Sequence, residues 1–255
     1  MSPVQLDHVV VVVSSLADAT SRFADAGFSV TPGGRHDAIP TENALVVFAD
    51  GSYLELLAMQ DPATRDELRG LRAGAGWERH LKGVSAIARR FLPALAGGDG
   101  VADWVLRGSP LRRQAAALRT LGVKASGPVA MARERTDGTR LEWELLLPES
   151  RVHPFWIADR TPRELRVPPA SAHGNGATGI AAVRVRAPSV PTAALELGES
   201  LGTLPRLRDG VTTLELAGLG VEVVSGEREG ACGVVLAGCA GLSGALADFG
   251  VASGR

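Results

Sequence analysis

The stretch that decides the fold runs from residue 6 to residue 58 and reads LDHVVVVVSSLADATSRFADAGFSVTPGGRHDAIPTENALVVFADGSYLELLA. Residues 6–13 form an apolar, β-branched run, which predicts a strand covered on both faces. Ser14 or Ser15 offers a helix N-cap, apolar residues then recur at helical spacing, and Gly27 ends the helix. Residues 28–30, 43–48 and 53–58 predict three more strands, with turns over residues 31–34 and 50–51. The predicted order is therefore β-α-β-β-β.

The same pattern returns later in the chain. A strand is predicted over residues 101–107, a helix over 111–121 that Gly122 ends, and strands over 128–135, 141–147 and 153–158. A shift that aligns Gly27 with Gly122 also pairs His8 with Asp103. Such internal similarity indicates duplicated supersecondary units.

The rest of the chain sets the predicted domain boundaries. Residues 59–98 favour two amphipathic helices, separated around residues 74–76, and are interpreted as an insertion. A Pro-, Ala- and Gly-rich loop at 167–177 precedes a weaker third copy. We therefore predict a two-module domain over 1–166, with module one at 1–58, the helical insertion at 59–98 and module two at 99–166. A third, partial βαβββ module with a tail covers 167–255.

Composition excludes several classes of protein. Hydrophobic residues make up 45% and charged residues 22%, as in soluble globular proteins, and the net charge is −1. A near-neutral balance gives no electrostatic case for nucleic acid or an anionic membrane as partner. The N-terminus has no basic segment before its short apolar run, so no signal peptide or membrane span is expected. Cys232 and Cys239 form no metal-type pair and are expected to be buried thiols of a cytoplasmic protein.

Four segments carry a resemblance to a known family. They are Leu6-Asp7-His8-Val9-Val10, Gly33-Gly34-Arg35-His36, Thr41-Glu42-Asn43-Ala44-Leu45 and Gly51-Ser52-Tyr53-Leu54-Glu55-Leu56. With the repeated units, they resemble the glyoxalase-like branch of the vicinal oxygen chelate superfamily. The resemblance implies an α+β fold in which repeated βαβββ modules form a cupped, barrel-like mixed sheet.

The resemblance also implies a metal site. In the superfamily, ligands come from the first and last strands of each module, usually as His and Glu, and His8 and Glu55 match these positions in module one. Imidazole and carboxylate both bind divalent first-row metals, so Zn, Mn, Fe, Ni or Co is implied, with the identity open. Strand alternation predicts that Leu6, His8 and Val10 share one face. Burying a carboxylate without a partner is costly, which favours a role for the pair.

The later modules depart from this pattern. The second-module equivalent of His8 is Asp103, or Trp104 if the register slips by one residue, and residues 154–158 carry no carboxylate opposite Glu55. The third unit has Glu222 in a context like that of Glu55, but an apolar residue opposite His8. Only module one keeps a complete pair, and Asp103 is the candidate third ligand.

Further residues are candidates for substrate contact. Thr41 and Asn43 match family positions, and His36 lies in a glycine-rich segment that could reach the mouth of the cup. Aromatic side chains can form an apolar wall for a ligand. The candidate substrate-binding residues are His36, Thr41, Asn43, Trp104 and Trp156. Glu55 is also the candidate catalytic base.

Three functions stay open. The first is an enzyme in which a divalent metal, held by His8, Glu55 and Asp103, chelates an oxygen-rich small substrate for lyase, isomerase or dioxygenase chemistry. The second is a metal-free small-molecule binding or resistance protein, and the third is a family member that acts through protein contacts. A homodimer is the expected assembly if the third module completes one. The fold does not identify the substrate.

Overall fold

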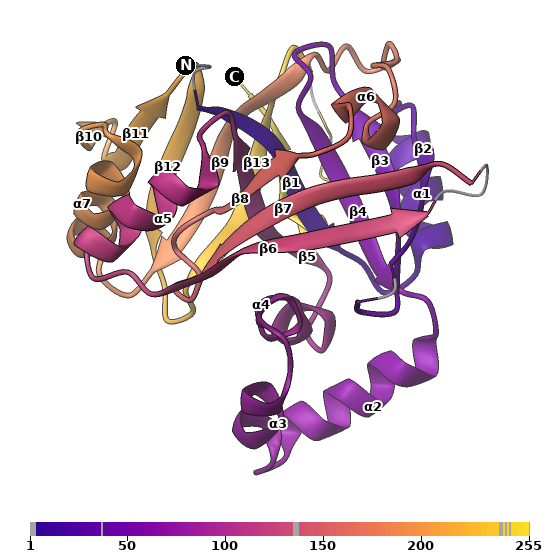
Figure 1. Cartoon of the computed structure of the whole chain (residues 1–255). Coiled ribbons are helices and arrows are strands. Elements are labelled where there is room, and N and C mark those ends of the chain that lie inside the picture. Colours follow the sequence, from indigo (N-terminus) through magenta and orange to yellow (C-terminus); the bar gives the residue numbers. More distant parts are fainter. Residues whose placement is uncertain are drawn as a thin grey trace.

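Two β-sheets organise the protein (Figure 1). The computed structural model describes residues 4–36, 38–134, 138–239, 242, 244 and 246–254. Strands of the first two modules form an eight-stranded sheet in the order β2-β3-β4-β1-β5-β8-β7-β6. The remaining strands form a six-stranded sheet in the order β10-β11-β12-β9-β13-β14. This arrangement confirms the predicted fold class of repeated βαβββ modules in a cupped mixed sheet.

Module one contains β1 (Gln5–Val12), α1 (Leu16–Asp25), β2 (Thr31–His36), β3 (Thr41–Val47) and β4 (Tyr53–Met59). Ser15 caps α1 by accepting a hydrogen bond from the amide of Asp18, as its position in the sequence predicts. Gly27 follows the helix with φ of +85°, a conformation that glycine adopts without strain. Strand β1 pairs parallel with β4 and antiparallel with β5.

Strand β2 differs from the prediction. It spans Thr31–His36, where a turn was expected, and residues 28–30 are not a strand. A Cβ on Gly33 would lie 2.0 Å from Oδ1 of Asn43, and one on Gly34 would lie 1.9 Å from a guanidinium nitrogen of Arg133. The two glycines therefore allow side chains of other strands to approach the backbone closely, and they do not mark a turn.

Module two and the insertion follow. The insertion contains three helices, not the two expected: α2 (Pro62–Ala73), α3 (Trp77–Gly83) and α4 (Ala86–Leu95). Module two contains β5 (Gly100–Arg107), α5 (Leu111–Thr120), β6 (Ala125–Glu134), β7 (Arg140–Pro148) and β8 (Phe155–Asp159), followed by α6 (Arg163–Arg166). In Figure 1 the insertion projects below the eight-stranded sheet. Within the described residues, no helix is long and apolar enough to cross a membrane.

The third module is more complete than the sequence indicated. It contains β9 (Gly179–Ala187), α7 (Val190–Leu201), β10 (Arg206–Arg208), β11 (Val211–Leu216) and β12 (Leu219–Ser225). Strand β13 (Gly230–Ala237) pairs antiparallel with β9, as β5 does with β1. A short 3₁₀ helix, η1 (Ala247–Phe249), precedes β14 (Val251–Ser253), which pairs parallel with β13. The chain thus continues into the first and last strands of a fourth unit.

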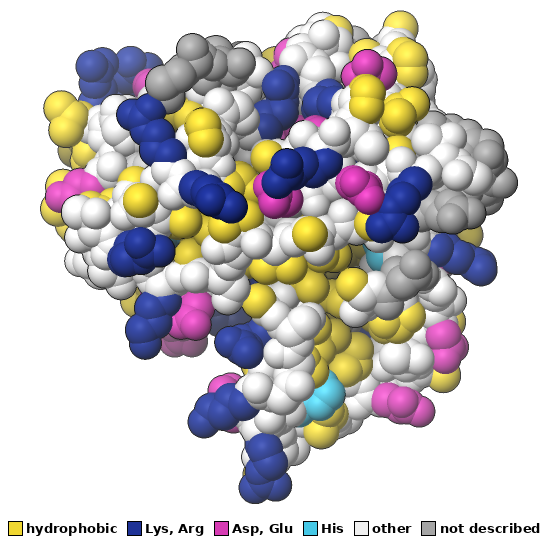
Figure 2. Space-filling view, in the orientation of Figure 1, with side chains coloured by type: hydrophobic (Ala, Val, Ile, Leu, Met, Phe, Trp, Pro, Cys, Tyr) yellow, Lys and Arg dark blue, Asp and Glu magenta, His cyan; other side chains and the backbone are white. Residues whose placement is uncertain are grey.

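Two apolar clusters lie on opposite faces of the eight-stranded sheet. The larger one joins its outer face to α1, α5, α7 and the six-stranded sheet, and includes fully buried Trp104 and Trp156. The second lies inside the cup and packs β1, β4, β7 and β8 against α4 through Phe91. Each fully buried side chain of this size stabilises the fold by about 1.5–3 kcal/mol. Figure 2 shows a hollow with apolar walls between the insertion and the sheet.

A β-bulge in β1 sets the orientation of its polar residues. Leu6 pairs with Leu106 and His8 pairs with Val105, so Asp7 is an extra residue without a partner in β5. Leu6 consequently packs in the outer cluster, whereas His8 faces the cup. The expectation that Leu6 and His8 share one face is wrong, because a bulge breaks the strict alternation of a strand.

Candidate functional site

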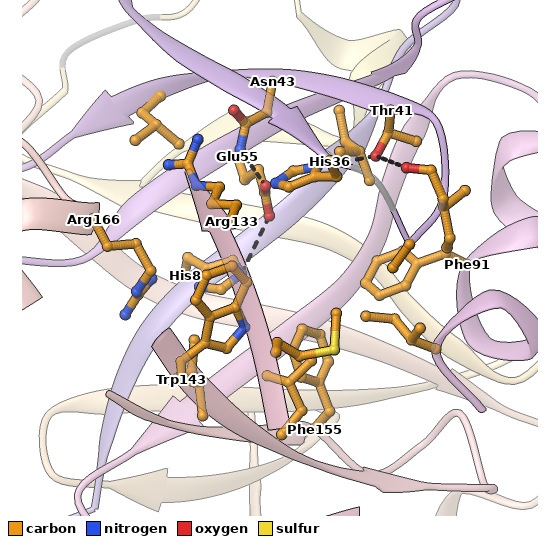
Figure 3. A pocket seen from close by; sticks show the side chains of 18 of the residues that line it. His8, His36, Thr41, Asn43, Glu55, Phe91, Arg133, Trp143, Phe155 and Arg166 are labelled. Carbon is orange, nitrogen blue, oxygen red and sulfur yellow. Dashed lines mark hydrogen bonds and ion pairs between the residues drawn. The ribbon is translucent and has the colours of Figure 1, made fainter. Parts of the chain in front are cut away.

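A cavity of about 120 Å³ lies in the cup of the eight-stranded sheet (Figure 3). Its two sides differ in chemistry. Polar side chains of module one line one side: His8, His36, Thr41, Asn43 and Glu55. Side chains of module two and α4 line the other, and all of them except Arg133 are apolar: Ile87, Phe91, Met131, Arg133, Trp143, Leu145, Phe155 and Ile157. A ligand with an oxygen-bearing end and an apolar body would match both sides.

His8 is held between two carboxylates. Its Nδ1 lies 2.8 Å from Oδ1 of Asp7, and its Nε2 lies 3.3 Å from Oε2 of Glu55. The ring also stacks on Tyr53, with centroids 4.6 Å apart. Burial alone would lower the pKa of His8, but the hydrogen bonds with Asp7 and Glu55 outweigh it and raise that pKa. The two carboxylates therefore favour the imidazolium form of His8, in which Nε2 faces Glu55.

Glu55 is an ionised carboxylate at the cavity wall. Burial raises its pKa, but the contact with His8, the positive charge of His8 and the nearby His36 more than offset this effect. Asn43 adds a hydrogen bond from Nδ2 to Oε1 at 2.5 Å. The resulting pKa of Glu55 is about 2. Glu55 is therefore negatively charged throughout the physiological pH range.

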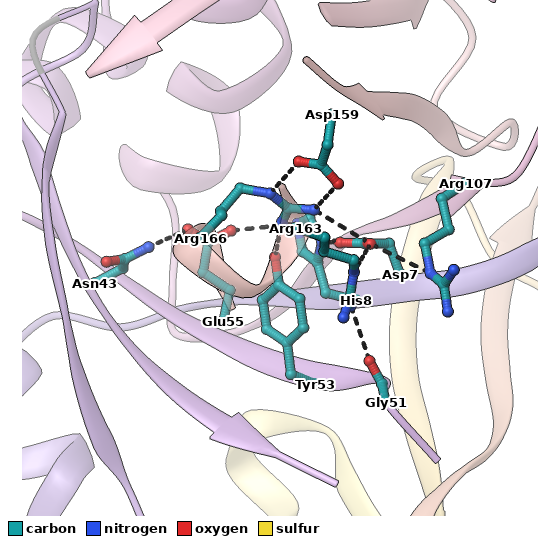
Figure 4. A network of polar contacts seen from close by, with 10 residues as sticks. All are labelled: Asp7, His8, Asn43, Gly51, Tyr53, Glu55, Arg107, Asp159, Arg163 and Arg166. Carbon is teal, nitrogen blue, oxygen red and sulfur yellow. Dashed lines mark hydrogen bonds and ion pairs between the residues drawn. The ribbon is translucent and has the colours of Figure 1, made fainter. Parts of the chain in front are cut away.

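Asp7 anchors His8 to a cluster of arginines (Figure 4). This fully buried carboxylate lies 3.1 Å from Nε of Arg163, 3.2 Å from Nη1 of Arg166 and 3.5 Å from Nε of Arg107. Burial pushes the pKa of Asp7 up, yet Arg166, His8 and Arg163 hold it well below its usual range. Three guanidinium groups compensate the buried charge, so Asp7 stays ionised and fixes Nδ1 of His8.

Arg166 ties this cluster to the second module. It donates to the hydroxyl of Tyr53 at 2.6 Å and to Asp159 at 2.7 Å, and its side chain reaches the cavity. Desolvation works against its charge, but Tyr53, Asp7 and Asp159 raise the pKa of Arg166 well above its usual value. The His8 ring thus rests on a support that spans β1, β4, β8 and α6.

Three predicted substrate-binding residues reach the cavity. His36 Nδ1 lies 3.0 Å from the hydroxyl of Thr41, which in turn donates to the carbonyl of Ile39. Asn43 bridges β2 and β4, because its Oδ1 accepts from the amide of Gly34 while its Nδ2 donates to Glu55. These contacts fix the orientation of the polar wall.

Asp103, Trp104 and Trp156 lie away from the cavity. Asp103 makes a buried bidentate ion pair with Arg90 of α4, at 2.6 and 2.8 Å. Trp104 and Trp156 point to the opposite face of the sheet and fill the outer cluster. Aromatic side chains do line the cup, but they are those of Tyr53, Phe91, Trp143 and Phe155.

The strand register explains this displacement. His8 pairs with Tyr53 across β1 and β4, and Val105 pairs with Phe155 across β5 and β8. Val105 and Ile157 therefore occupy the second-module positions of His8 and Glu55. The glycine spacing placed Asp103 opposite His8, but Asp103 lies two residues before the true equivalent, Val105. Both second-module positions carry hydrocarbon side chains.

In the third module, the carboxylate is committed to an ion pair. Glu222 pairs in register with Arg184, as Glu55 does with Val10. The guanidinium of Arg184 lies 2.8 Å from Oε2 of Glu222. Glu222 therefore occupies the same position in the fold as Glu55, but its partner is an arginine.

The donor set fits one edge of a metal coordination shell. Two ligands at typical bond lengths of a divalent ion lie about 3.0–3.4 Å apart, and Nε2 of His8 and Oε2 of Glu55 are 3.3 Å apart. Asp7 on Nδ1 matches the carboxylate–histidine support of metal ligands. No group of three His, Cys, Asp or Glu side chains is placed for a metal ion among the described residues. Water or substrate oxygens would have to supply the remaining ligands.

Sequence reasoning missed several residues of this site. Asp7 stands beside His8 in an otherwise apolar strand, so a charged neighbour was a visible signal. Arg163 and Arg166 are spaced i,i+3 after module two, which places two guanidinium groups on one helical face. Phe91 belongs to the insertion, and nothing in its sequence indicates that it closes a cup built by other segments.

The family model described as "Glyoxalase-like domain" matches residues 6–201. The chain therefore belongs to the glyoxalase-like family of the vicinal oxygen chelate superfamily. The strand order, with modules joined through β1 and β5, agrees with this assignment. No curated protein matches the sequence.

Solved structures share the fold at low sequence identity. A hypothetical protein from Staphylococcus aureus is 16% identical with a TM-score of 0.68, over 91% of this chain and 90% of that chain. The Mn(II)-bound glyoxalase from Novosphingobium aromaticivorans is 12% identical with a TM-score of 0.52, over 92% of this chain and 66% of that chain. A variant of 4-hydroxymandelate synthase from Streptomyces coelicolor is 12% identical with a TM-score of 0.51, over 98% and 75%.

Proposed function

We propose that the protein is an enzyme that binds a small oxygen-bearing organic molecule in the cup, with His8 and Glu55 as its reactive centre. The observation that carries this proposal is the facing pair itself, at 3.3 Å in a cavity whose opposite wall is apolar. Such a cavity orients a ligand, because its apolar body would pack against module two and α4 while its polar end faces the His8–Glu55 pair. Trp143 and Phe155 would hold the apolar body.

The role of Glu55 follows from its acidity. A general base works best when its pKa lies near the working pH, and the pKa of Glu55 is about 2. We therefore assign Glu55 as an anionic ligand in preference to a catalytic base. Together with His8 it would hold a divalent metal, which when bound would polarise substrate oxygens and stabilise an oxyanion. The Mn(II)-bound state of one structural neighbour supports this choice without identifying the ion.

The chain's own residues would prepare that site. Asp7 accepts the hydrogen bond from Nδ1–H of His8 and so keeps that proton on the ring. Loss of the other ring proton would therefore leave Nε2 with a free lone pair that can bind the ion. Because that proton pairs His8 with Glu55 beforehand, metal binding would release it and strengthen as the pH rises. Asn43 would keep Oε1 of Glu55 in place while Oε2 binds.

A second candidate is metal-free binding of a small molecule. Val105 and Ile157 stand where two further ligands would be needed, and this observation favours the second candidate. The His8–Glu55 pair satisfies its own charges, so the cavity is stable without an ion. An apolar ligand would then bind against module two.

Calorimetric titration with Mn²⁺ and Zn²⁺ separates the two candidates. We expect the parent to bind one ion, and His8→Ala and Glu55→Gln to bind it at least about tenfold more weakly, because each removes a direct ligand. Glu42→Gln is the matched control, since it removes a carboxylate of β3 that faces Arg35 outside the cavity. Unchanged affinity in His8→Ala and Glu55→Gln, or a parent that binds neither ion, would exclude the metal site and leave the metal-free candidate.

A further inference from the structure

A second, larger hollow lies where the three parts of the chain meet. It has a volume of about 690 Å³ and lies between α4, the start of β5 and the turn that leads into β13. We call it the seam groove. Its lining shares no residue with the cavity in the cup, although α4 contributes side chains to both.

Arginines dominate the charge of the seam groove. Five of them line it: Arg72, Arg89, Arg151, Arg186 and Arg228. Within the described part of the chain, none of these five takes part in an ion pair with a carboxylate. An excess of charge of one sign in a cleft attracts counter-ions of the other sign.

The carboxylates of the groove do not cancel this charge. Asp99 is bound to Arg65 at 2.9 Å, and Asp248 makes a bidentate ion pair with Arg22 at 2.8 and 2.9 Å. Both acids are therefore neutralised by arginines outside the groove lining. Glu149 and Glu229 are the other acidic side chains of the lining, and both are exposed to solvent. Arginine is thus in excess.

Backbone carbonyls hold several of the guanidinium groups in place. Arg72 donates to the carbonyl of Pro93 at 2.8 Å. Arg151 donates to the carbonyls of Arg90 and of Ala102, the latter at 2.9 Å. Side chains fixed before a ligand arrives lose little conformational entropy on binding. Arg186 and Arg228 line the same space from β9 and from the turn before β13.

We propose that the seam groove binds a small multivalent oxyanion, such as a metabolite that carries a phosphate or several carboxylates. Guanidinium groups recognise phosphate and carboxylate through paired, charge-assisted hydrogen bonds. The insertion, the two-module sheet and the third module each contribute arginines to the groove. One bound anion of this kind would compensate the positive charge of all three. The inference rests on residues outside the cup, so it stands or falls separately from the proposed function.

Calorimetry with inorganic pyrophosphate, and in a second arm with citrate, tests the proposal on the full chain. The test variant is Arg186→Gln with Arg228→Gln. The matched control is Arg112→Gln with Arg119→Gln, which removes two charges from the exposed side of α5. We expect the parent and the control to bind with equal affinity and the test variant to bind at least about tenfold more weakly.

The salt dependence of binding and the comparison of the two ligands give two further measurements. Binding should weaken between about 50 mM and about 200 mM salt, as expected for displacement of counter-ions. Binding of pyrophosphate alone would identify phosphate as the recognised group, and binding of citrate alone would identify carboxylate. Absence of binding in both arms at the lower salt, or equal weakening in the test and control variants, would overturn the proposal.

Discussion

Replacing Asp103 by alanine tests whether this residue serves the fold or the site. Its carboxylate is 1% exposed and its partner Arg90 is 3% exposed, with two hydrogen bonds between them. The guanidinium also donates to the carbonyls of Pro148 and His153. Removing one partner of a buried pair leaves the other charge without compensation, which costs about 3–5 kcal/mol. We therefore expect Asp103→Ala to remove a large part of the stability of an ordinary domain.

Urea unfolding followed by tryptophan fluorescence measures this loss. The control is the double variant Arg90→Met with Asp103→Leu, which removes both charges and fills the space. It should be more stable than Asp103→Ala, because no uncompensated ion remains, although two carbonyls lose their donor. A loss below about 1 kcal/mol in Asp103→Ala, or a double variant no better than the single one, would refute the reasoning.

Three further predictions follow from the site. Glu55 has a pKa of about 2 in the fold, against 4.5 when unpaired. It should therefore stabilise the fold by about 3 kcal/mol above about pH 4.5 and lose this contribution as the pH falls toward 2. Unfolding of the parent and of Glu55→Gln across this pH range checks the prediction, and a difference in unfolding free energy that stays constant with pH would contradict it. Burial and a neighbouring arginine lower the pKa of His153 to about 4. The histidine of the unfolded chain takes up its proton near pH 6.5, so the stability of the fold should decrease as the pH drops below this value. An NMR titration of the His153 imidazole with a midpoint near 6.5 would refute this. Gly33→Ala should lower the unfolding free energy by about 1–3 kcal/mol, because the new methyl group meets both the side chain and the backbone carbonyl of Asn43. The loss should exceed that in Gly34→Ala, and equal unfolding midpoints of the two variants in urea would contradict this.

The sequence predicted those parts of the fold that local chemistry controls. The valine-rich β1, the Ser15 cap and the glycine after α1 all lie within a few neighbouring residues, and each is found where expected. The repeated modules could be recognised because their elements keep the same order. His8 and Glu55 could be placed in one cup because the family resemblance assigns ligands to the first and last strands of a module, and both strands are recognisable in the sequence.

Long-range register could not be predicted. The bulge at Asp7 depends on how β1 pairs with β5, and a shift of one residue moves a side chain to the other face. Asp103 was interpreted as a ligand because its true partner, Arg90, belongs to the insertion and has no counterpart in the repeat. Trp104 was assigned to the cup because the glycine spacing misplaced this position: His8 lies eight residues before the start of α1, whereas its equivalent Val105 lies six residues before the start of α5.

The bulge in β1 has an evolutionary consequence. Asp7 is the additional residue between Leu6 and His8, so a strand one codon shorter would keep Leu6 in the outer cluster and His8 in the cup. A single in-frame deletion would therefore remove the carboxylate that anchors the imidazole and leave the apolar side chains of β1 on their present faces. The length of β1 at this one position thus decides whether Nδ1 of His8 has an anionic partner.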